Sequence, residues 1–215
     1  DEGIAGLGES GAWGFLEASA QAIQTFADYL VGKDPLDIEH HWQYLYRFSH
    51  FRGAAVMGAI SAIDIALWDI AGKFYGVPVY RLLGGKCRNK VRVYNHTAGR
   101  TEDELVESAK KAVAEGYTAL GHLNPYLDEP RDLPYRDGNA AMLYKAERRI
   151  AMIREAVGEE VDLCLELHRR LEPGLAIQLS ARLEPYAPMF LEDPIRPDNF
   201  DAMAEVAQKC RIPIA

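Results

Sequence analysis

Residues 161–193 read VDLCLELHRRLEPGLAIQLSARLEPYAPMFLED, which is a strand pattern followed by a helix pattern and a second strand pattern. The β-rich, apolar run at 161–168 predicts the first strand, residues 174–183 predict the helix, and residues 188–192 predict the second strand. Two strands joined through a helix pair in parallel, because the helix carries the chain back to the starting edge. This stretch therefore predicts a β/α unit of a parallel sheet.

The same alternation runs through the second part of the chain. Further strands are predicted at 91–95 and 118–124, with the start of a fifth at 212–215; further helices are predicted at 101–115, 141–157 and 200–209. Thr101 is the expected N-cap, because Glu104 follows it by three residues. A doubly wound sheet and an eight-fold barrel both fit this order. No Gly-rich phosphate loop follows the first strand, which disfavours a dinucleotide-binding sheet, and four and a half units suggest a barrel cut roughly in half.

The first part of the chain has a different organisation. Helices are predicted at 18–30 and 38–47, and a third helix carries Val56, Ile60, Ile63, Leu67 and Ile70 on one stripe. A charged turn at the front feeds an alternating run, as in the second strand of a hairpin, and the chain lacks an initial Met; we therefore expect a fragment. The predicted fold class is α/β, with an incomplete helical capping domain at 1–88 and the first half of a TIM-like barrel at 89–215.

Composition excludes several classes of protein. The 215 residues carry 24 Lys+Arg against 32 Asp+Glu, a net charge of −8, which disfavours a nucleic-acid partner. The three cysteines are far apart and lack CxxC spacing, which fits a reducing compartment and predicts a cytoplasmic protein. Asp64 and Asp69 interrupt the longest apolar stretch, so we expect no membrane partner.

Acidic side chains stand at the carboxyl ends of two predicted strands. Glu166 and His168 share one face of the strand at 161–168, and Glu192 has the same place on the next strand. Neighbouring carboxylates repel each other unless a cation joins them, and oxygen ligands favour Mg²⁺ over zinc. His168 is placed for general acid–base chemistry beside such an ion. Two simpler alternatives remain: the carboxylates pair with Arg169, Arg170 or Arg196, or His168 is a hydrogen-bonded structural histidine.

Four motifs in this order resemble a known family. They are AIDIALWDIAGK at 62–73, GVPVYRLLGG at 76–85, ELHRR at 166–170 and LEDPIRPDN at 191–199. They resemble the mandelate racemase/muconate lactonizing enzyme group of the enolase superfamily, and within it the acid-sugar dehydratases of the galactonate and mannonate type. The resemblance covers essentially the whole chain.

The resemblance implies a capping domain over a modified (β/α)₇β barrel that holds Mg²⁺ on three carboxylates. Glu166 and Glu192 match the first two ligands, and the third would lie beyond Ala215. In such dehydratases a base removes the proton α to the substrate carboxylate and Mg²⁺ stabilises the enediolate. An acid, matched by His168, then assists departure of the β-hydroxyl. The base would lie in the missing half.

One motif departs from the racemases and lactonizing enzymes of the group. They carry a Lys-x-Lys pair on the second strand, whereas residues 120–125 read LGHLNP. Two-base racemisation by lysines is therefore disfavoured. His122 and Asn124, which alternate onto one face, either contact the substrate hydroxyls or hydrogen-bond within the barrel. The polar loop that follows, with Tyr126 and Arg131, either adds a residue to the site or is solvated.

These observations predict a Mg²⁺-dependent lyase that dehydrates a sugar acid through an enediolate. The alternatives are a cycloisomerase or epimerase that uses the same intermediate, or an inactive fragment that only packs with a partner. Because the third ligand and the base are expected beyond Ala215, we expect the chain alone to show little turnover. The complete protein is expected to be a homo-oligomer.

Overall fold

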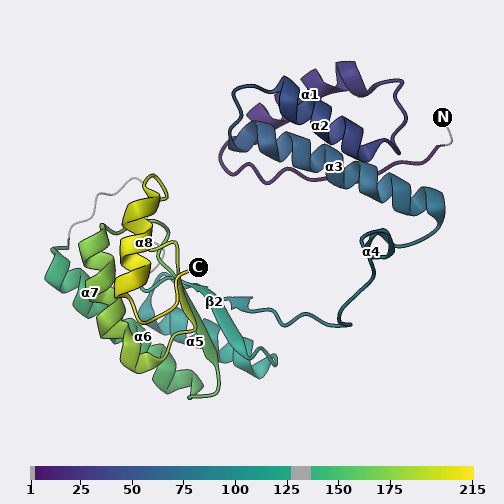
Figure 1. Ribbon diagram of the computed structural model, residues 1–215. Coiled ribbons are helices and arrows are strands. Elements are labelled where there is room, and N and C mark those ends of the chain that lie inside the picture. Colours follow the sequence, from purple (N-terminus) through teal and green to yellow (C-terminus); the bar gives the residue numbers. More distant parts are fainter. Residues whose placement is uncertain (1–2, 127–136) are drawn as a thin grey trace. The chain divides into compact units, whose positions relative to one another are not determined.

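The computed structural model describes residues 3–126 and 137–215, and it divides the chain into two compact units. The first unit is Asp1–Lys90 and the second is Val91–Ala215 (Figure 1). Each unit has its own hydrophobic core, so each is described by itself.

A parallel sheet forms the centre of the second unit. Its strands are β1 (Asn95–His96), β2 (Ala119–Leu123), β3 (Asp162–Glu166) and β4 (Phe190–Glu192). They lie side by side in chain order, and a bridge between Leu191 and Ile214 continues the sheet beyond β4. A doubly wound sheet reverses its strand order at a switch point, whereas a barrel adds each strand next to the previous one. The order therefore favours the barrel, and the α/β prediction is confirmed.

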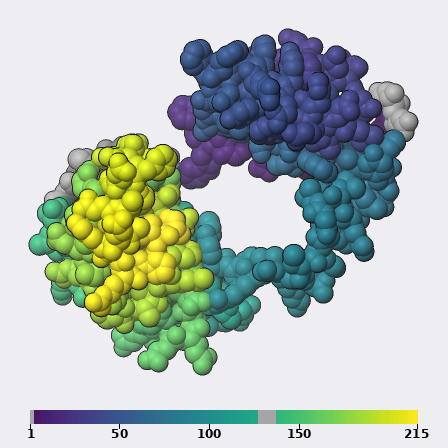
Figure 2. Space-filling view, in the orientation of Figure 1, coloured from purple at the N-terminus to yellow at the C-terminus, as the bar shows by residue number. Residues whose placement is uncertain are grey.

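Helices cover one face of this sheet. They are α5 (Glu102–Ala114), α6 (Asn139–Val157), α7 (Pro173–Leu183) and α8 (Phe200–Lys209), with the short helix η1 (Glu184–Tyr186) after α7. Figure 2 shows α8 on the visible surface of this unit. Leu163 and Leu165 of β3 pack among helix residues such as Ile150 and Leu179 in one core. Because strand side chains alternate, Cys164 and Glu166 belong to the opposite face.

Helix α5 begins as the sequence predicts. Thr101 is its N-cap, and the Thr101 hydroxyl accepts a hydrogen bond from the Glu104 backbone N–H at 3.2 Å. The Glu104 carboxylate reaches back and accepts from the backbone N–H of Arg100. These two hydrogen bonds fix the start of the helix that follows β1.

The first unit is helical. Its elements are α1 (Leu16–Leu30), α2 (Ile38–Phe48), α3 (Ala54–Tyr75) and α4 (Val79–Leu82). Phe26, Leu45 and Ile60, one from each long helix, meet in its core. By length and composition α3 is, within residues 3–126 and 137–215, the one helix that would suit a membrane span. Core helices of soluble proteins can have the same length and composition, so these properties of α3 are weak evidence for a membrane span.

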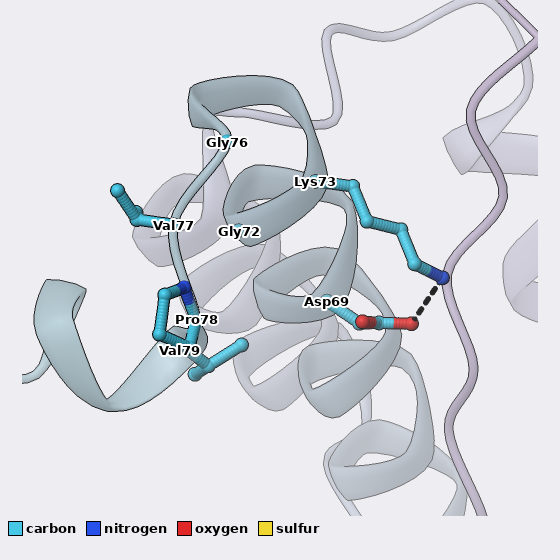
Figure 3. A pocket seen from close by; sticks show the side chains of 7 residues that line it. All are labelled: Asp69, Gly72, Lys73, Gly76, Val77, Pro78 and Val79. Carbon is cyan, nitrogen blue, oxygen red and sulfur yellow. Dashed lines mark hydrogen bonds and ion pairs between the residues drawn. The ribbon is translucent and has the colours of Figure 1, made fainter.

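The expected strand at the front of the chain is not formed. The structure assigns residues 3–12 to no strand, and two of their backbone groups bond to side chains of α3 instead. The Leu7 N–H donates to Asp69 at 2.8 Å, and Lys73 donates to the Ala5 carbonyl at 2.7 Å. Asp69 and Lys73 also pair with each other, on the wall of a pocket between α3 and α4 (Figure 3).

Two glycines permit this close approach to α3. A Cβ on Gly6 would lie 2.0 Å from the Ala66 carbonyl oxygen, and one on Gly8 would lie 1.8 Å from that of Ala62. Both distances are far below contact, and the opposing atoms are backbone. The segment therefore needs glycine at both positions.

The first strand of the parallel sheet is shorter than its prediction at 91–95, because β1 forms only at Asn95–His96.

Candidate active site

Glu166 and Glu192 end two neighbouring strands of the parallel sheet. Glu166 is the last residue of β3, Glu192 is the last of β4, and the two are register partners. The Leu167 N–H donates to the Glu192 carbonyl at 3.0 Å, so the pairing continues past the strand ends. Neighbouring strands lie about 4.8 Å apart, which brings the two backbones within the span of one ion site.

The electrostatics of Glu166 reflect its burial. Only 3% of its surface is exposed, and desolvation raises the pKa of its carboxyl to about 7. A hydrogen bond of 2.6 Å from the His168 backbone N–H to Oε1 opposes that rise, whereas the charges of Glu192 and Asp193 add to it. A buried carboxyl with acidic neighbours is ionised at low cost only when a cation compensates its charge.

The donor set fits Mg²⁺, which binds carboxylate oxygens and prefers few protein ligands. Two of the three arginines proposed as alternative partners form ion pairs with other carboxylates: Arg169 with Asp193 at 3.2 Å and Arg196 with Glu172 at 3.0 Å. The charge of Arg169 nevertheless lowers the pKa of Glu166. Glu166 and Glu192 are therefore suited to hold two positions of a magnesium site.

His168 lies just beyond β3, where the backbone turns sharply. Both His168 (φ 51°) and Arg169 (φ 61°) are in the left-handed region, which non-glycine residues rarely adopt. Burial lowers the pKa of His168, and its electrostatic interactions with His122 and Arg169 lower it further. The neutral imidazole that this environment favours offers one donor and one acceptor.

A β-bulge places His122 beside His168. Leu120 pairs with Leu163 but Leu123 pairs with Leu165, so β2 uses one more residue than β3 over this interval. His122 lies inside the bulge with φ 51°. Its ring meets that of His168 edge-on, with centroids 4.7 Å apart. The structure thus brings His122, Glu166 and His168 together, with ligand atoms that all lie within 4.8 Å of one another.

Asn124 is the second residue of this segment that was predicted to contact the substrate. It follows β2 and is buried, and its side-chain oxygen accepts from the Tyr126 N–H at 2.8 Å. The expectation that His122 and Asn124 share one face assumed a regular strand, whereas the register of β2 shifts between Leu120 and Leu123; it stays a prediction. Tyr126 is buried next to it, while Arg131 lies outside the described residues.

His96 is a neighbour of the site that the sequence reasoning missed. It ends β1, and its ring stacks on that of His122 with centroids 4.7 Å apart and planes 5° apart. The available signal was a histidine directly after the strand predicted at 91–95, at the carboxyl edge of the sheet where His168 was also expected. Tyr94 covers the sheet here, since a Cβ on Gly121 would lie 1.9 Å from its ring. Histidines from β1, β2 and the turn after β3 therefore lie in contact one after another, and two of them, His122 and His168, lie beside Glu166.

A parallel β/α sheet with carboxylates and histidines at its carboxyl edge defines a class of barrel enzyme. Residues 1–84 match the N-terminal domain of mandelate racemase/muconate lactonizing enzymes, and residues 104–215 match the enolase C-terminal domain-like family. The chain belongs to the mandelate racemase/muconate lactonizing enzyme group of the enolase superfamily.

Curated relatives of this chain are named as dehydratases. It is 38% identical over 216 residues to a D-galactonate dehydratase from Ralstonia nicotianae and 37% identical to one from Pectobacterium atrosepticum. Each alignment covers 100% of this chain and 55% of the relative, so the chain spans about half the length of the curated relatives it matches.

Solved structures share the fold. A putative dehydratase from Salmonella enterica serovar Typhimurium has a TM-score of 0.92 at 37% identity, and this chain covers 59% of it. An enolase from Pantoea ananatis with bound D-gluconate and Mg has a TM-score of 0.85 at 32% identity, with 58% covered. The 3,6-anhydro-D-galactonate cycloisomerase from Zobellia galactanivorans has a TM-score of 0.87 at 30% identity, with 56% covered. All three alignments cover 100% of this chain.

Proposed function

We propose that this chain belongs to a Mg²⁺-dependent dehydratase that removes water from a sugar acid. The observation that carries the proposal is the buried Glu166, in register with Glu192 and beside His168. Two comparisons support the proposal. A curated relative is named D-galactonate dehydratase, and the Pantoea ananatis enolase has D-gluconate and Mg bound.

In this proposal Glu166 and Glu192 hold Mg²⁺, which when bound supplies the positive charge that stabilises an enediolate anion. His168, in its imidazolium form, donates a proton to the departing β-hydroxyl of the substrate and returns to the neutral imidazole that its surroundings favour. The α-proton lost to a base and the departing hydroxyl together amount to one water, and the enol product becomes a 2-keto acid. His122 and Asn124 bind substrate hydroxyls, and Asn124 can donate from Nδ2 while its Oδ1 accepts from the Tyr126 N–H.

The remaining assignments follow from the same proposal. Residues 1–88 form a capping domain and residues 89–215 form the first half of the barrel. The complete protein acts in the cytoplasm as a homo-oligomer, with a small sugar acid as its partner and neither nucleic acid nor membrane.

A cycloisomerase or epimerase is the second candidate, because both reactions use the same anion. The 30% identity to the Zobellia galactanivorans cycloisomerase favours it specifically. The histidine beside Glu166 favours dehydration, because a leaving hydroxyl needs an acid close to the ion site.

A panel of aldonates distinguishes these functions. The protein expressed from its complete reading frame is incubated with Mg²⁺ and each aldonate, and 2-keto acid formation is measured. We expect dehydration of at least one aldonate, loss of activity in Glu192→Gln, and a fall of about 100-fold or more in His168→Gln. Glu160→Gln is the matched control, because Glu160 is exposed and precedes β3 at its opposite end.

Two results would contradict the proposal. Isomerised or epimerised aldonate without keto acid would make the second candidate correct, and a fully active Glu192→Gln would remove the metal site. The same panel is applied to residues 1–215 alone to test the inactive-fragment alternative. We expect this 215-residue chain to show little turnover.

A further inference from the structure

We propose that His122, His168 and Glu166 form a second metal site, which takes a borderline transition-metal ion such as Zn²⁺ or Co²⁺. This site shares Glu166 with the proposed magnesium site and does not use Glu192. The inference rests on the proposed function only through this shared residue. Its two nitrogen ligands come from β2 and from the turn after β3.

The geometry of the three side chains carries the inference. A nitrogen of each imidazole and a carboxylate oxygen of Glu166 lie within 4.8 Å of one another. Ligand atoms around one zinc ion lie about 3.3 Å apart when each metal–ligand bond is about 2.0–2.1 Å long in a tetrahedral site. Small rotations of side chains that already face one another therefore complete the arrangement.

The backbone holds the ligands in this position. His122 sits in the β-bulge and His168 in the following turn, both in the left-handed conformation. Such conformations are retained where the surrounding structure over-determines them, and they cluster at ligand sites. The hydrogen bond of 2.6 Å from the His168 backbone N–H to Oε1 orients the Glu166 carboxylate. The ring of His96, which stacks on that of His122, orients the His122 imidazole.

The donor chemistry decides which ion is bound. Two imidazoles and one carboxylate are the set that zinc enzymes use with an open fourth position, whereas Mg²⁺ prefers oxygen ligands. The sites share one carboxylate, so an ion on His122 and His168 competes with Mg²⁺ on Glu192. We therefore expect Zn²⁺ or Co²⁺ to displace Mg²⁺ and to hold His168 away from substrate.

Cobalt titration tests this site without measuring turnover. Co²⁺ is added to the metal-free 215-residue chain, and its visible absorption reports the number and type of ligands. We expect one ion with the intense bands of low coordination. His122→Ala lowers the affinity at least 10-fold, while His50→Ala, which changes an exposed histidine, leaves it unchanged. Circular dichroism verifies that each variant is folded, and His122→Gln serves if the alanine variant is not.

Glu192→Gln separates this proposal from the proposed function. We expect it to keep Co²⁺ binding and to lose Mg²⁺ binding, measured by calorimetry. If Glu192→Gln loses Co²⁺ while His122→Ala retains it, the ion lies on the carboxylate pair; the second site is then wrong, although the magnesium site stands. Wild-type chain that binds no Co²⁺ also overturns the proposal.

Discussion

Glu166 is buried at the end of β3, where water no longer stabilises its charge. Its neighbours Glu192 and Asp193 add repulsion, so the folded chain favours the protonated carboxyl. A group that is costly to ionise in the folded state makes stability depend on pH. The same property makes Glu166 responsive to a divalent cation.

We expect Glu166→Gln to remove a pH dependence of folding. The pKa of Glu166 is raised from 4.5 to about 7, so its stabilising contribution is complete below 4.5 and disappears as pH rises through 7. Without divalent ions, Glu166→Gln should be about 3 kcal/mol more stable than wild type near pH 8 and within about 1 kcal/mol of it near pH 5.

Urea unfolding at the two pH values measures this difference. Glu160→Gln is the control, because its exposed carboxyl should leave the pH dependence of wild type intact. Equal pH dependence in Glu166→Gln and wild type would show that Glu166 is not destabilised by its burial.

The close contact between the N-terminal segment and α3 depends on glycine. A Cβ on Gly8 would lie 1.8 Å from the carbonyl oxygen of Ala62, which is a backbone atom inside α3 and cannot move without disturbing that helix. We expect Gly8→Ala to detach residues 3–12 from α3 and to destabilise the first unit by about 1–3 kcal/mol.

Amide exchange of residues 3–12 detects that detachment, with faster exchange at Leu7, whose N–H donates to Asp69. Gly11→Ala is the matched control in the same segment, since a Cβ there meets nothing within 4 Å. Equal protection in Gly8→Ala and Gly11→Ala would contradict the proposed packing.

Helices and buried strands could be predicted from the sequence because periodicity reports burial directly. The stripe through Ile60 and Leu67 and the cap at Thr101 are examples that the structure confirms. The element against which a segment packs could not be predicted from the sequence. Residues 3–12 alternate like a strand but lie against a helix. Gly121 in LGHLNP is a signal for either a bulge or a close contact, and it does not say where the register shifts.

The part of the candidate site that lies at strand ends could be predicted from the sequence, because the strand ends could be predicted. Glu166 and Glu192 follow apolar runs, so a parallel sheet must bring them to one edge. The approach of His122 to His168 depends on the bulge, and the hydrogen bond that occupies Asn124 depends on a turn. Both are tertiary features without a sequence period.

Chain order explains how distant residues meet. The strands add one after another, so positions 122, 166 and 192 reach the same edge while all the covering helices pack on one face of the sheet. The chain matches both family domains and spans about 55% of its curated relatives. Within that span it carries two of the carboxylates that the proposed magnesium site requires.

Calorimetric titration of Mg²⁺ into the metal-free chain is the most direct test of the paired carboxylates. We expect one ion to bind to wild type and to Glu160→Gln, with affinity at least 10-fold weaker in both Glu166→Gln and Glu192→Gln. Equal Mg²⁺ affinity in Glu192→Gln and Glu160→Gln would contradict the account, because the two strand ends would then not share an ion.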